Sequence, residues 1–305
     1  MEFDEHRAMT IAKDILRFAV DNYRNRGETH IPDYRNTLTP GFSHEYINYM
    51  LGGAYRGSFR PLNDAVIAGR IRGVAAIVGC TNPRIRHDSM HTAITSALLK
   101  QDVLVVETGC SAIASAKAGF LVGDAGLDRV GPGLREVCET VGIPPVLHMG
   151  SCVDNTRILT VLTQMVAEGG LGDDIDEIPA VGIAPEWMSE KALSIATYCV
   201  ASGVYVIMGG TNPVEGRAEK VPESVLVADY MSSGWEELYG GKLEFLTDAD
   251  EIITRTLAHI DAKRAALGLA AYDPTRFGNS GDARARELEA LPLPERRAAI
   301  YGTVT

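Results

Sequence analysis

Long apolar runs are absent from this chain of 305 residues. A membrane-spanning helix needs about 20 consecutive, mostly apolar residues. The longest uncharged stretch, Ala192 to Val214, is interrupted at Gly203 and again at Gly209, which is typical of a helix, a turn and a strand. The N-terminal segment is acidic and has no apolar core of a signal peptide. We therefore expect a cytoplasmic protein with no membrane partner.

An excess of positive charge is absent as well. Lys and Arg number 29 against 40 Asp and Glu, so the formal net charge is −11 and the pI is about 5.1. An acidic chain without a long basic run argues against nucleic acid as the main partner. The hydrophobic fraction of 46% and the charged fraction of 23% indicate an ordinary folded protein. Its length allows one large or two modest domains.

Cysteine is scarce, and several well-known catalytic and nucleotide-binding motifs are missing. The five cysteines are an odd number and do not form the framework of a disulfide-rich secreted protein. Neither GxxxxGK[ST] nor GxSxG occurs. Gly131 and Gly133 precede a predicted helix but do not follow a strand, so they predict no dinucleotide site. The cysteines should be free thiols, metal ligands or core residues.

Short apolar runs alternate with helical segments through the middle of the chain. The apolar runs are Val74–Val78, Val103–Val106, Pro145–Leu147, Pro179–Ala184 and Val204–Ile207. The helical segments between and after them are Ser89–Leu99, Ala112–Leu121, Leu134–Val141, Arg157–Glu168 and Ser189–Ala201. Continuous apolar strands separated by helices predict an α/β fold with a Rossmann-like, doubly wound, mostly parallel sheet covered on both faces.

Helices should flank this sheet at both ends of the chain. Apolar residues that recur every three or four positions predict a helix at Met9–Arg26. Ser43 is a suitable N-cap for a second helix that ends at Leu51. We expect a helical lead-in at residues 1–60 and a doubly wound α/β domain at 61–268, which ends with a helix at Ala249–Leu267. A loosely held tail should follow at 269–305, with a helix near Asp282–Leu291.

Three cysteines occupy equivalent places in the predicted topology. Cys80, Cys110 and Cys152 each follow a strand and precede a helix, with a glycine one or two residues earlier. Open parallel sheets bind ligands at the carboxyl ends of their strands, and a thiol at a helix N-terminus is a better nucleophile or metal ligand. We therefore favour a functional role for these thiols, as nucleophiles or as metal ligands, over core packing. Cys138 and Cys199 lie inside predicted helices, and we expect them to be packing residues.

Other side chains near these strand ends are weaker candidates. Three thiolates are too few for a tetrahedral zinc site. His148 could be a further ligand, but a hydrogen-bonded structural histidine is the favoured interpretation. His87 and His91 could pair on a helix, yet the glutamate of an HExxH motif is missing, which disfavours a zinc site. Lys191 follows the fourth strand; such lysines are usually solvated, but beside a metal cluster this one could donate protons or stabilise an oxyanion.

Several segments together resemble one known family of enzymes. They are GCTN (79–82), DVLVVETGC (102–110), GLREVC (133–138), VLHMGSCVDN (146–155), WMSEKA (187–192) and ASGVY (201–205). They resemble the C-terminal third of nickel-dependent, anaerobic carbon monoxide dehydrogenase, of the type that associates with acetyl-CoA synthase. The likeness runs from about residue 5 to about residue 268.

The resemblance implies interconversion of CO and water with CO2, two protons and two electrons at a Ni-4Fe-4S cluster. Cys80 and Cys110 match thiolate ligands of iron, and Cys152 matches the thiolate that holds nickel. Lys191 matches a lysine that hydrogen-bonds the CO2 carboxylate and assists proton movement. Ile195 matches an apolar residue that lines the gas-binding position. His148 would support the cluster rather than bind nickel.

The resemblance also implies that other parts of the enzyme are needed. The family has an N-terminal helical domain that carries electrons and a middle domain that supplies a histidine and two cysteines to the cluster, and nothing here matches them. The chain would then hold a partial ligand set, as a split subunit completed in trans, a fragment or a relic. An apolar face should surround Cys80, Cys110 and Cys152 where the missing domains belong.

Partners and alternatives follow from the same resemblance. The implied partners are the missing N-terminal and middle domains, with a homodimer, acetyl-CoA synthase and ferredoxin as further candidates. One alternative is a hybrid-cluster protein of the hydroxylamine reductase type, which the segment HMGSCVDN (148–155) disfavours. A second alternative is a module that binds a metal cluster or a partner but catalyses nothing.

Overall fold

The structure is a computed structural model that describes residues 4–31, 33, 38–52, 57–210 and 234–277. The chain divides into two compact units, residues 1–36 with 304–305 and residues 37–303. In the first unit, helix α1 (Ala8–Asn22) lies between the short 3-10 turns η1 (Glu5–Arg7) and η2 (Tyr23–Asn25). The predicted N-terminal helix is therefore confirmed. Most of its large apolar side chains are exposed, and Ile11 is buried.

The second unit is built on a sheet of six parallel strands. They are β1 (Gly73–Ile77), β2 (Val103–Thr108), β3 (Val146–Gly150), β4 (Ala180–Ala184), β5 (Tyr205–Gly209) and β6 (Leu243–Leu246). Their order is β3-β2-β1-β4-β5-β6, and every neighbouring pair is parallel. The order reverses between β1 and β4, which makes the sheet doubly wound as predicted.

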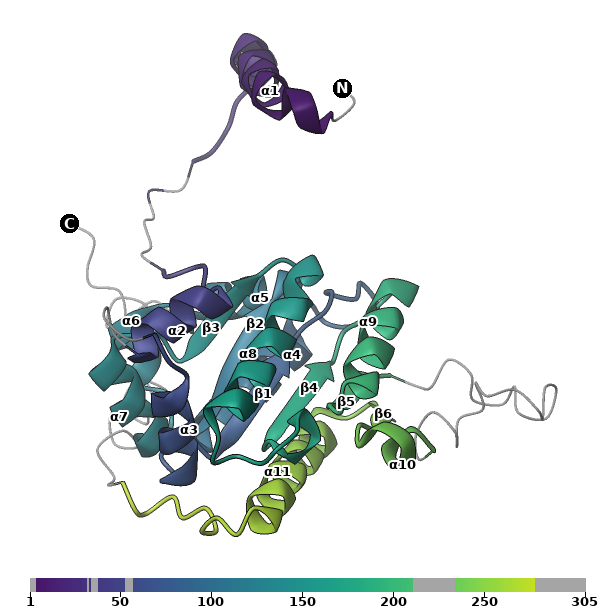
Figure 1. Ribbon diagram of the computed structural model, residues 1–305. Helices are drawn as coiled ribbons and strands as arrows, with labels where there is room; N and C mark the ends of the chain where they lie inside the picture. The colour runs from purple at the N-terminus through teal and green to yellow at the C-terminus, as the bar shows by residue number, and fades with distance from the viewer. Residues whose placement is uncertain (1–3, 32, 34–37, 53–56, 211–233, 278–305) are drawn as a thin grey trace, which may run out of the picture. The chain divides into compact units, whose positions relative to one another are not determined.

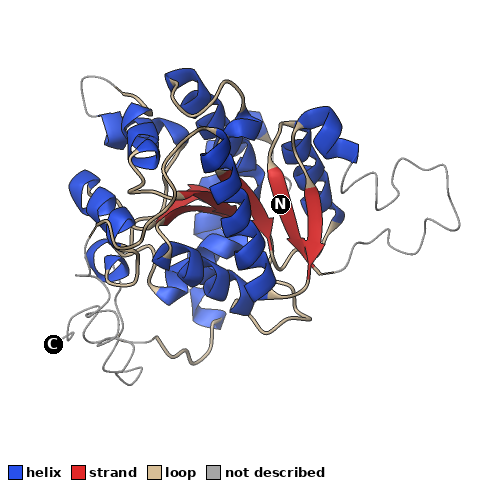
Figure 2. Cartoon of the chain, turned by 90° about the horizontal axis from the view of Figure 1, so that it is seen from below, coloured by secondary structure: helices blue, strands red, loops and turns tan. Residues whose placement is uncertain are grey.

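Helices cover both faces of the sheet (Figure 2). They are α2 (His44–Gly52), α3 (Arg60–Ile67), α4 (Ser89–Lys100), α5 (Gly109–Ala118), α6 (Gly123–Leu127), α7 (Pro132–Val141), α8 (Asn155–Glu168), α9 (Glu190–Ala201), α10 (Trp235–Tyr239) and α11 (Ala249–Ala266), with 3-10 turns η3 (Cys152–Asp154) and η4 (Ile175–Glu177). Helices α4, α5 and α11 pack on one face. Helices α8 and α9 cover the other face, where α2 and α3 pack against α8 (Figure 1).

The apolar runs form the centre of the core. All six residues of β2 and all five of β5 are buried, because helices cover these strands on both sides. The five strands predicted from apolar runs are all present, with ends shifted by at most three residues. Strand β6 was not predicted, since its four residues include the half-buried Glu244 and Phe245 and carry no continuous apolar run.

The residues after α11 remain attached to the sheet domain as far as residue 277. The Tyr272 hydroxyl donates a hydrogen bond to Asp102 Oδ2 at 2.9 Å. The buried Arg264 guanidinium donates to the carbonyl oxygens of Val66, Arg72 and Ala270. The helix expected at 282–291 lies outside the described residues. The boundaries proposed at residues 60 and 268 stay predictions.

The carboxyl group of Glu107 is fully buried in β2, three residues before Cys110. Glu107 Oε1 accepts hydrogen bonds from Thr95 Oγ1 and Ser115 Oγ, each at 2.9 Å. Burial raises the pKa of Glu107 from 4.5 to about 8, since the charged form loses its hydration. The folded chain therefore keeps this group protonated at neutral pH.

This buried acid predicts that stability falls as the pH rises. The folded state binds the Glu107 proton between pH 4.5 and about 8, whereas the unfolded state does not. Its contribution is complete below pH 4.5 and is lost as the pH passes through 8, by on the order of 5 kcal/mol at most. Urea unfolding of wild type and Glu107→Gln at pH 6 and pH 9 measures it. The glutamine variant should lose much less stability at pH 9; an equal loss in both chains would reject the assignment.

Candidate functional site

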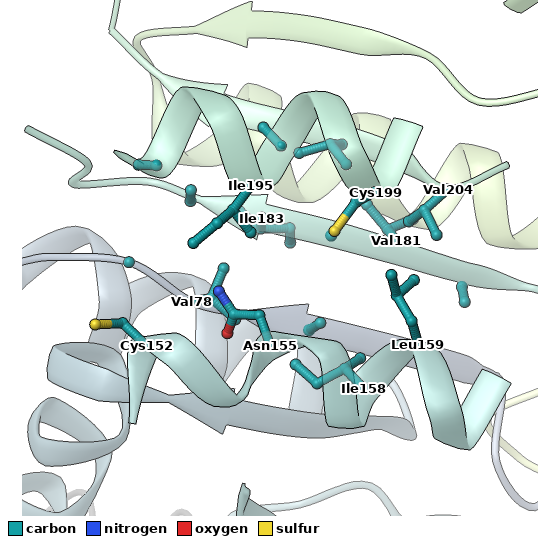
Figure 3. Close-up of a pocket in the computed structure, with 18 of the residues that line it drawn as sticks. Val78, Cys152, Asn155, Ile158, Leu159, Val181, Ile183, Ile195, Cys199 and Val204 are labelled. Atoms are coloured by element: carbon teal, nitrogen blue, oxygen red, sulfur yellow. The ribbon is translucent and has the colours of Figure 1, made fainter. Parts of the chain in front are cut away.

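An apolar cavity of about 70 Å³ lies where the strand order reverses, between β1 and β4. Helices α8 and α9 enclose it, and side chains from the two helices face each other across it (Figure 3). Its lining is almost entirely apolar, with Val78, Ile183, Ile195 and Leu159 among the residues. Cys80, Cys152 and Lys191 also line it. The cavity runs along the face of the sheet, and its end at Cys80, Cys152 and Lys191 lies at the carboxyl ends of the strands, where open α/β sheets bind their ligands.

The turn after β3 holds Cys152 in a defined position. Ser151 caps the 3-10 turn η3, and the Asp154 carboxylate accepts from the Ser151 backbone N–H at 2.8 Å, so the two form a capping box. Arg157 Nε donates to the other Asp154 oxygen at 3.1 Å. Gly150 has a φ of +135°, and a Cβ there would lie 2.5 Å from Asp154 Oδ2. The geometry of this turn thus requires Gly150, Ser151 and Asp154 around Cys152.

The turn after β2 brings the start of α5, where Cys110 lies, against Cys152. Gly109, the first residue of α5, has a φ of +62°, and a Cβ added to it would lie 3.2 Å from Cys152 Cβ. Glycine therefore allows this turn to approach the Cys152 backbone closely. Cys110 is the second residue of α5 and is exposed, whereas Cys152 is half-buried.

Lys191 contacts Cys152 directly across the crevice. Lys191 lies in the first turn of α9, and its Nζ donates a hydrogen bond to Cys152 Sγ at 2.9 Å. This contact is the main cause of a raised pKa of the Lys191 amino group, and Cys80 and Cys110 add smaller electrostatic contributions in the same direction. The amino group therefore lies within electrostatic range of all three thiols. Ile195 lines the cavity one helical turn further along α9.

All three cysteines follow a strand and precede a helix, as predicted, but only two of them lie at the start of a helix. Cys110 lies at the N-terminus of α5 and Cys152 begins η3, but Cys80 does not lie at a helix N-terminus. It lies in the loop between β1 and α4, and α4 begins only at Ser89. The intervening residues form turns that pack against the end of β4, so the position of Cys80 depends on that loop.

A profile of the Prismane/CO dehydrogenase family matches residues 1–249. The chain belongs to this family. It is 45% identical over 271 residues to carbon monoxide dehydrogenase 1 of Methanosarcina mazei, and the match covers 88% of this chain and 41% of that protein. It is 34% identical to the beta subunit of carbon monoxide dehydrogenase/acetyl-CoA synthase of Moorella thermoacetica, with 88% and 40% covered.

Solved structures of carbon monoxide dehydrogenases share this fold. A Ni-free crystal structure of the enzyme from Thermococcus sp. AM4 has a TM-score of 0.78 and 43% identity, covering 88% of this chain and 41% of that one. An acetyl-CoA synthase/carbon monoxide dehydrogenase structure with nickel-containing clusters in its alpha subunits has a TM-score of 0.77 and 32% identity, with 88% and 40% covered. This family member thus spans about two fifths of the length of these relatives.

The donor set of this family member suits part of a cluster better than a single metal ion. Within the described ranges, no group of three or more His, Cys, Asp or Glu side chains is arranged to hold one ion. An iron–sulfur cluster takes its thiolates one per iron, so its protein ligands surround an inorganic core and do not meet at a point. Cys80 and Cys152 on one cavity, with Cys110 beside them, fit such an arrangement but do not complete it.

The histidines do not form a zinc pair. His148 Nδ1 accepts a hydrogen bond from the Gly150 N–H at 3.1 Å, and burial lowers the pKa of its ring. This is the structural hydrogen bond that the sequence favoured. His87 is exposed and lies beside Lys117 and Asp88, whereas His91 is fully buried with its Nε2 2.8 Å from the Cys80 carbonyl oxygen. The two rings of the i, i+4 pair thus face different surroundings.

The remaining cysteines are packing residues, as predicted. Cys138 is fully buried in α7, and burial raises the pKa of its thiol to about 12. Burial also raises the pKa of the Cys199 thiol, to about 11. Both are therefore neutral and unreactive at physiological pH. Cys199 additionally forms part of the cavity wall, which its position within a helix did not indicate (Figure 3).

Two polar residues of the site escaped the sequence analysis. Asn155 begins α8, lines the cavity and accepts a hydrogen bond from Thr108 Oγ1. Its position three residues after Cys152, in the segment HMGSCVDN, could have indicated that it belongs to the site. Glu186 is fully buried just after β4 and accepts from the Met90 backbone N–H at 3.0 Å. No sequence motif marks it, because its partner lies in helix α4, far away in the sequence.

Exposed apolar side chains lie close in the sequence to Cys110, Cys152 and Lys191. Ile113 is 53% exposed one turn after Cys110, and Val153 is 71% exposed next to Cys152. Met188, three residues before Lys191, is 55% exposed. Apolar surface at each of these points agrees with the expected face for missing domains. No helix in the described part of the chain is long and apolar enough to cross a membrane.

Proposed function

We propose that this chain is the C-terminal part of a nickel-dependent carbon monoxide dehydrogenase that interconverts CO and water with CO2, two protons and two electrons. The observation that carries the proposal is the contact of Lys191 Nζ with Cys152 Sγ at the mouth of the apolar cavity. It unites a proton donor, a thiolate ligand and a compartment for a small apolar gas. The named relatives above are carbon monoxide dehydrogenases, which favours this activity over that of a hybrid-cluster protein.

Three thiols of the chain would hold part of a Ni-4Fe-4S cluster. Cys152 would bind nickel, and Cys80 and Cys110 would bind iron. When bound, this cluster supplies the two-electron redox chemistry that amino-acid side chains lack. The thiols come from the ends of β1, β2 and β3, which supports binding along one edge of the sheet. The remaining ligands would come from the missing N-terminal and middle domains.

Lys191 would provide charge and protons at this edge. Its pKa is raised, so Nζ carries a proton at neutral pH. An ammonium at this place can donate a hydrogen bond to an oxygen of bound CO2. It can also pass its proton to that oxygen. Its position opposite Cys152 puts that hydrogen bond next to the proposed nickel ligand.

The cavity would exclude water and admit gas. Ile195, Val78 and Ile183 give its wall no polar atoms to hold ordered water. CO and CO2 are small and carry no net charge, so they lose little solvation on entering such a space. Ile195, close to Lys191 along α9, would border the gas-binding position.

The activity would require a complement, because the chain spans 41% of its Methanosarcina mazei relative. Exposed Ile113, Val153 and Met188 support docking of the N-terminal and middle domains near the cysteines. A homodimer and contacts with acetyl-CoA synthase and ferredoxin in an anaerobic cytoplasm remain further proposals from the family resemblance.

The proposal predicts activity only in the presence of that complement. The chain is co-produced without oxygen, with iron and nickel, together with the N-terminal 59% of the Methanosarcina mazei enzyme, the portion outside the match. CO-dependent reduction of viologen should appear with both pieces and stay at background with either piece alone. The full relative is the positive control.

Metal content and the choice of substrate distinguish the proposed function from its alternatives. A complex that contains iron and nickel but oxidises no CO would contradict the proposed activity. Reduction of hydroxylamine in place of CO oxidation would favour the hybrid-cluster alternative. A stable chain that contains no iron and does not bind the N-terminal piece would support the non-catalytic module.

A further inference from the structure

The loop that carries Cys80 is tied to the segment that carries Lys191. The Val78 N–H donates to the Ile183 carbonyl oxygen at 2.8 Å, which extends the β1–β4 pairing to the edge of the crevice. Beyond Cys80, Asn82 Nδ2 donates to the Trp187 carbonyl oxygen at 3.1 Å. Two segments far apart in the sequence therefore face each other over the cavity, and hydrogen bonds join them on both sides of Cys80.

Glu186 forms a buried part of this connection. Its side chain is fully buried, and Oε1 accepts from the Met90 N–H in the first turn of α4. The first N–H groups of a helix have no partner within the helix, and a carboxylate there is stabilised by the helix dipole. Oε2 is buried without a hydrogen-bond partner among the described residues. Glu186 thus holds the start of α4 against the end of β4.

His91 connects the same helix turn to Cys80 itself. Its ring is fully buried, and Nε2 lies 2.8 Å from the Cys80 carbonyl oxygen. A carbonyl oxygen only accepts, so Nε2 carries the hydrogen and donates it. Nδ1 has no partner in the part of the chain that the structure describes. Burying a histidine and a glutamate opposes folding unless their hydrogen bonds compensate, so two such residues beside one loop indicate a specific role.

We propose that Glu186 and His91 are positioning residues that hold Cys80 in register with Lys191 across the crevice between β1 and β4. This inference rests on the proposed function, in which Cys80 is a cluster ligand. Sites of this kind require ligand positions held to about 0.5 Å by surrounding hydrogen bonds. A loop can reach that precision only when neighbouring elements hold it, and the Cys80 loop has no helix N-terminus of its own to do so.

Thiol accessibility in the metal-free full chain tests the proposal without any cluster. Alkylation rates are measured for each cysteine by mass spectrometry in wild type and in the variants His91→Leu, His91→Gln, Glu186→Ala and Glu186→Gln. Loss of one buried hydrogen bond should increase Cys80 alkylation about tenfold in the leucine and alanine variants. The glutamine variants keep a donor or an acceptor at the same place and should stay within about twofold of wild type.

Cys110 and the fully buried Cys138 are internal references, because the hydrogen bonds described for His91 and Glu186 go to Cys80 and Met90, and because Cys138 reacts only when the fold opens. An unchanged rate at Cys80 would overturn the proposal. So would equal acceleration at Cys80 and Cys138, which means a general loss of stability. If the leucine and alanine variants do not fold, His91→Asn decides: its shorter amide keeps a polar group in the core but cannot reach the Cys80 carbonyl oxygen, so it should accelerate Cys80 alone. The alkylation rates are measured without a metal cluster, so they test this proposal even if the assembled complex does not oxidise CO.

Discussion

Replacing Cys152 with alanine should remove nickel from the assembled complex while the chain stays folded. Cys152 is the proposed nickel ligand, and loss of a thiolate should weaken nickel binding by more than about 100-fold. The Cys152 side chain is half-buried, and the turn that carries it is held by Ser151 and Asp154 instead. Nickel per complex, measured by elemental analysis after anaerobic purification, should therefore fall to background with an unchanged unfolding midpoint.

Cys199→Ala is the matched control for this experiment. Cys199 lies on the wall of the same cavity and is also a cysteine, but it is a neutral packing thiol on α9. Its replacement should leave nickel at the wild-type amount. Full nickel occupancy in the Cys152→Ala complex would show that Cys152 does not bind nickel, and would contradict the proposed placement of nickel next to Lys191.

Turnover should fall by about 100-fold or more when Lys191 is replaced with alanine, while iron and nickel stay bound. The reason is that Nζ is the charged donor of the crevice, next to the proposed nickel ligand. Lys191→Arg keeps the positive charge but has a planar donor of a different shape, so it should recover only part of the rate. Steady-state CO oxidation and metal content are measured on the same preparations.

Because Lys191 contacts Cys152, the metal content of the Lys191→Ala variant distinguishes a role on substrate from a role in holding the nickel ligand. If the alanine variant loses nickel in proportion to activity, Lys191 acts by holding Cys152 and not on substrate. If turnover is unchanged, its proposed role is wrong. Lys263→Ala on α11 is a control for the loss of one positive charge, since α11 packs against the face of the sheet opposite α9. That variant should match wild type in both measurements.

The α/β fold followed from local pattern. Runs such as Val103–Val106, each ending near a glycine, predicted buried strands, because only strands covered on both faces are continuously apolar. The same alternation placed Cys80, Cys110 and Cys152 after strand ends. The short strand β6 carries no such run and was missed.

The sequence alone determined which apolar runs form buried strands and which thiols follow them, because a continuous apolar run is a property of neighbouring residues. Only the tertiary structure decided that the strand order reverses between β1 and β4, that Lys191 reaches Cys152, and that Glu186 and His91 flank the Cys80 loop. Each of these depends on the packing of segments far apart in the chain. Such packing is determined by how the whole sheet buries its two faces, and no local spacing records it.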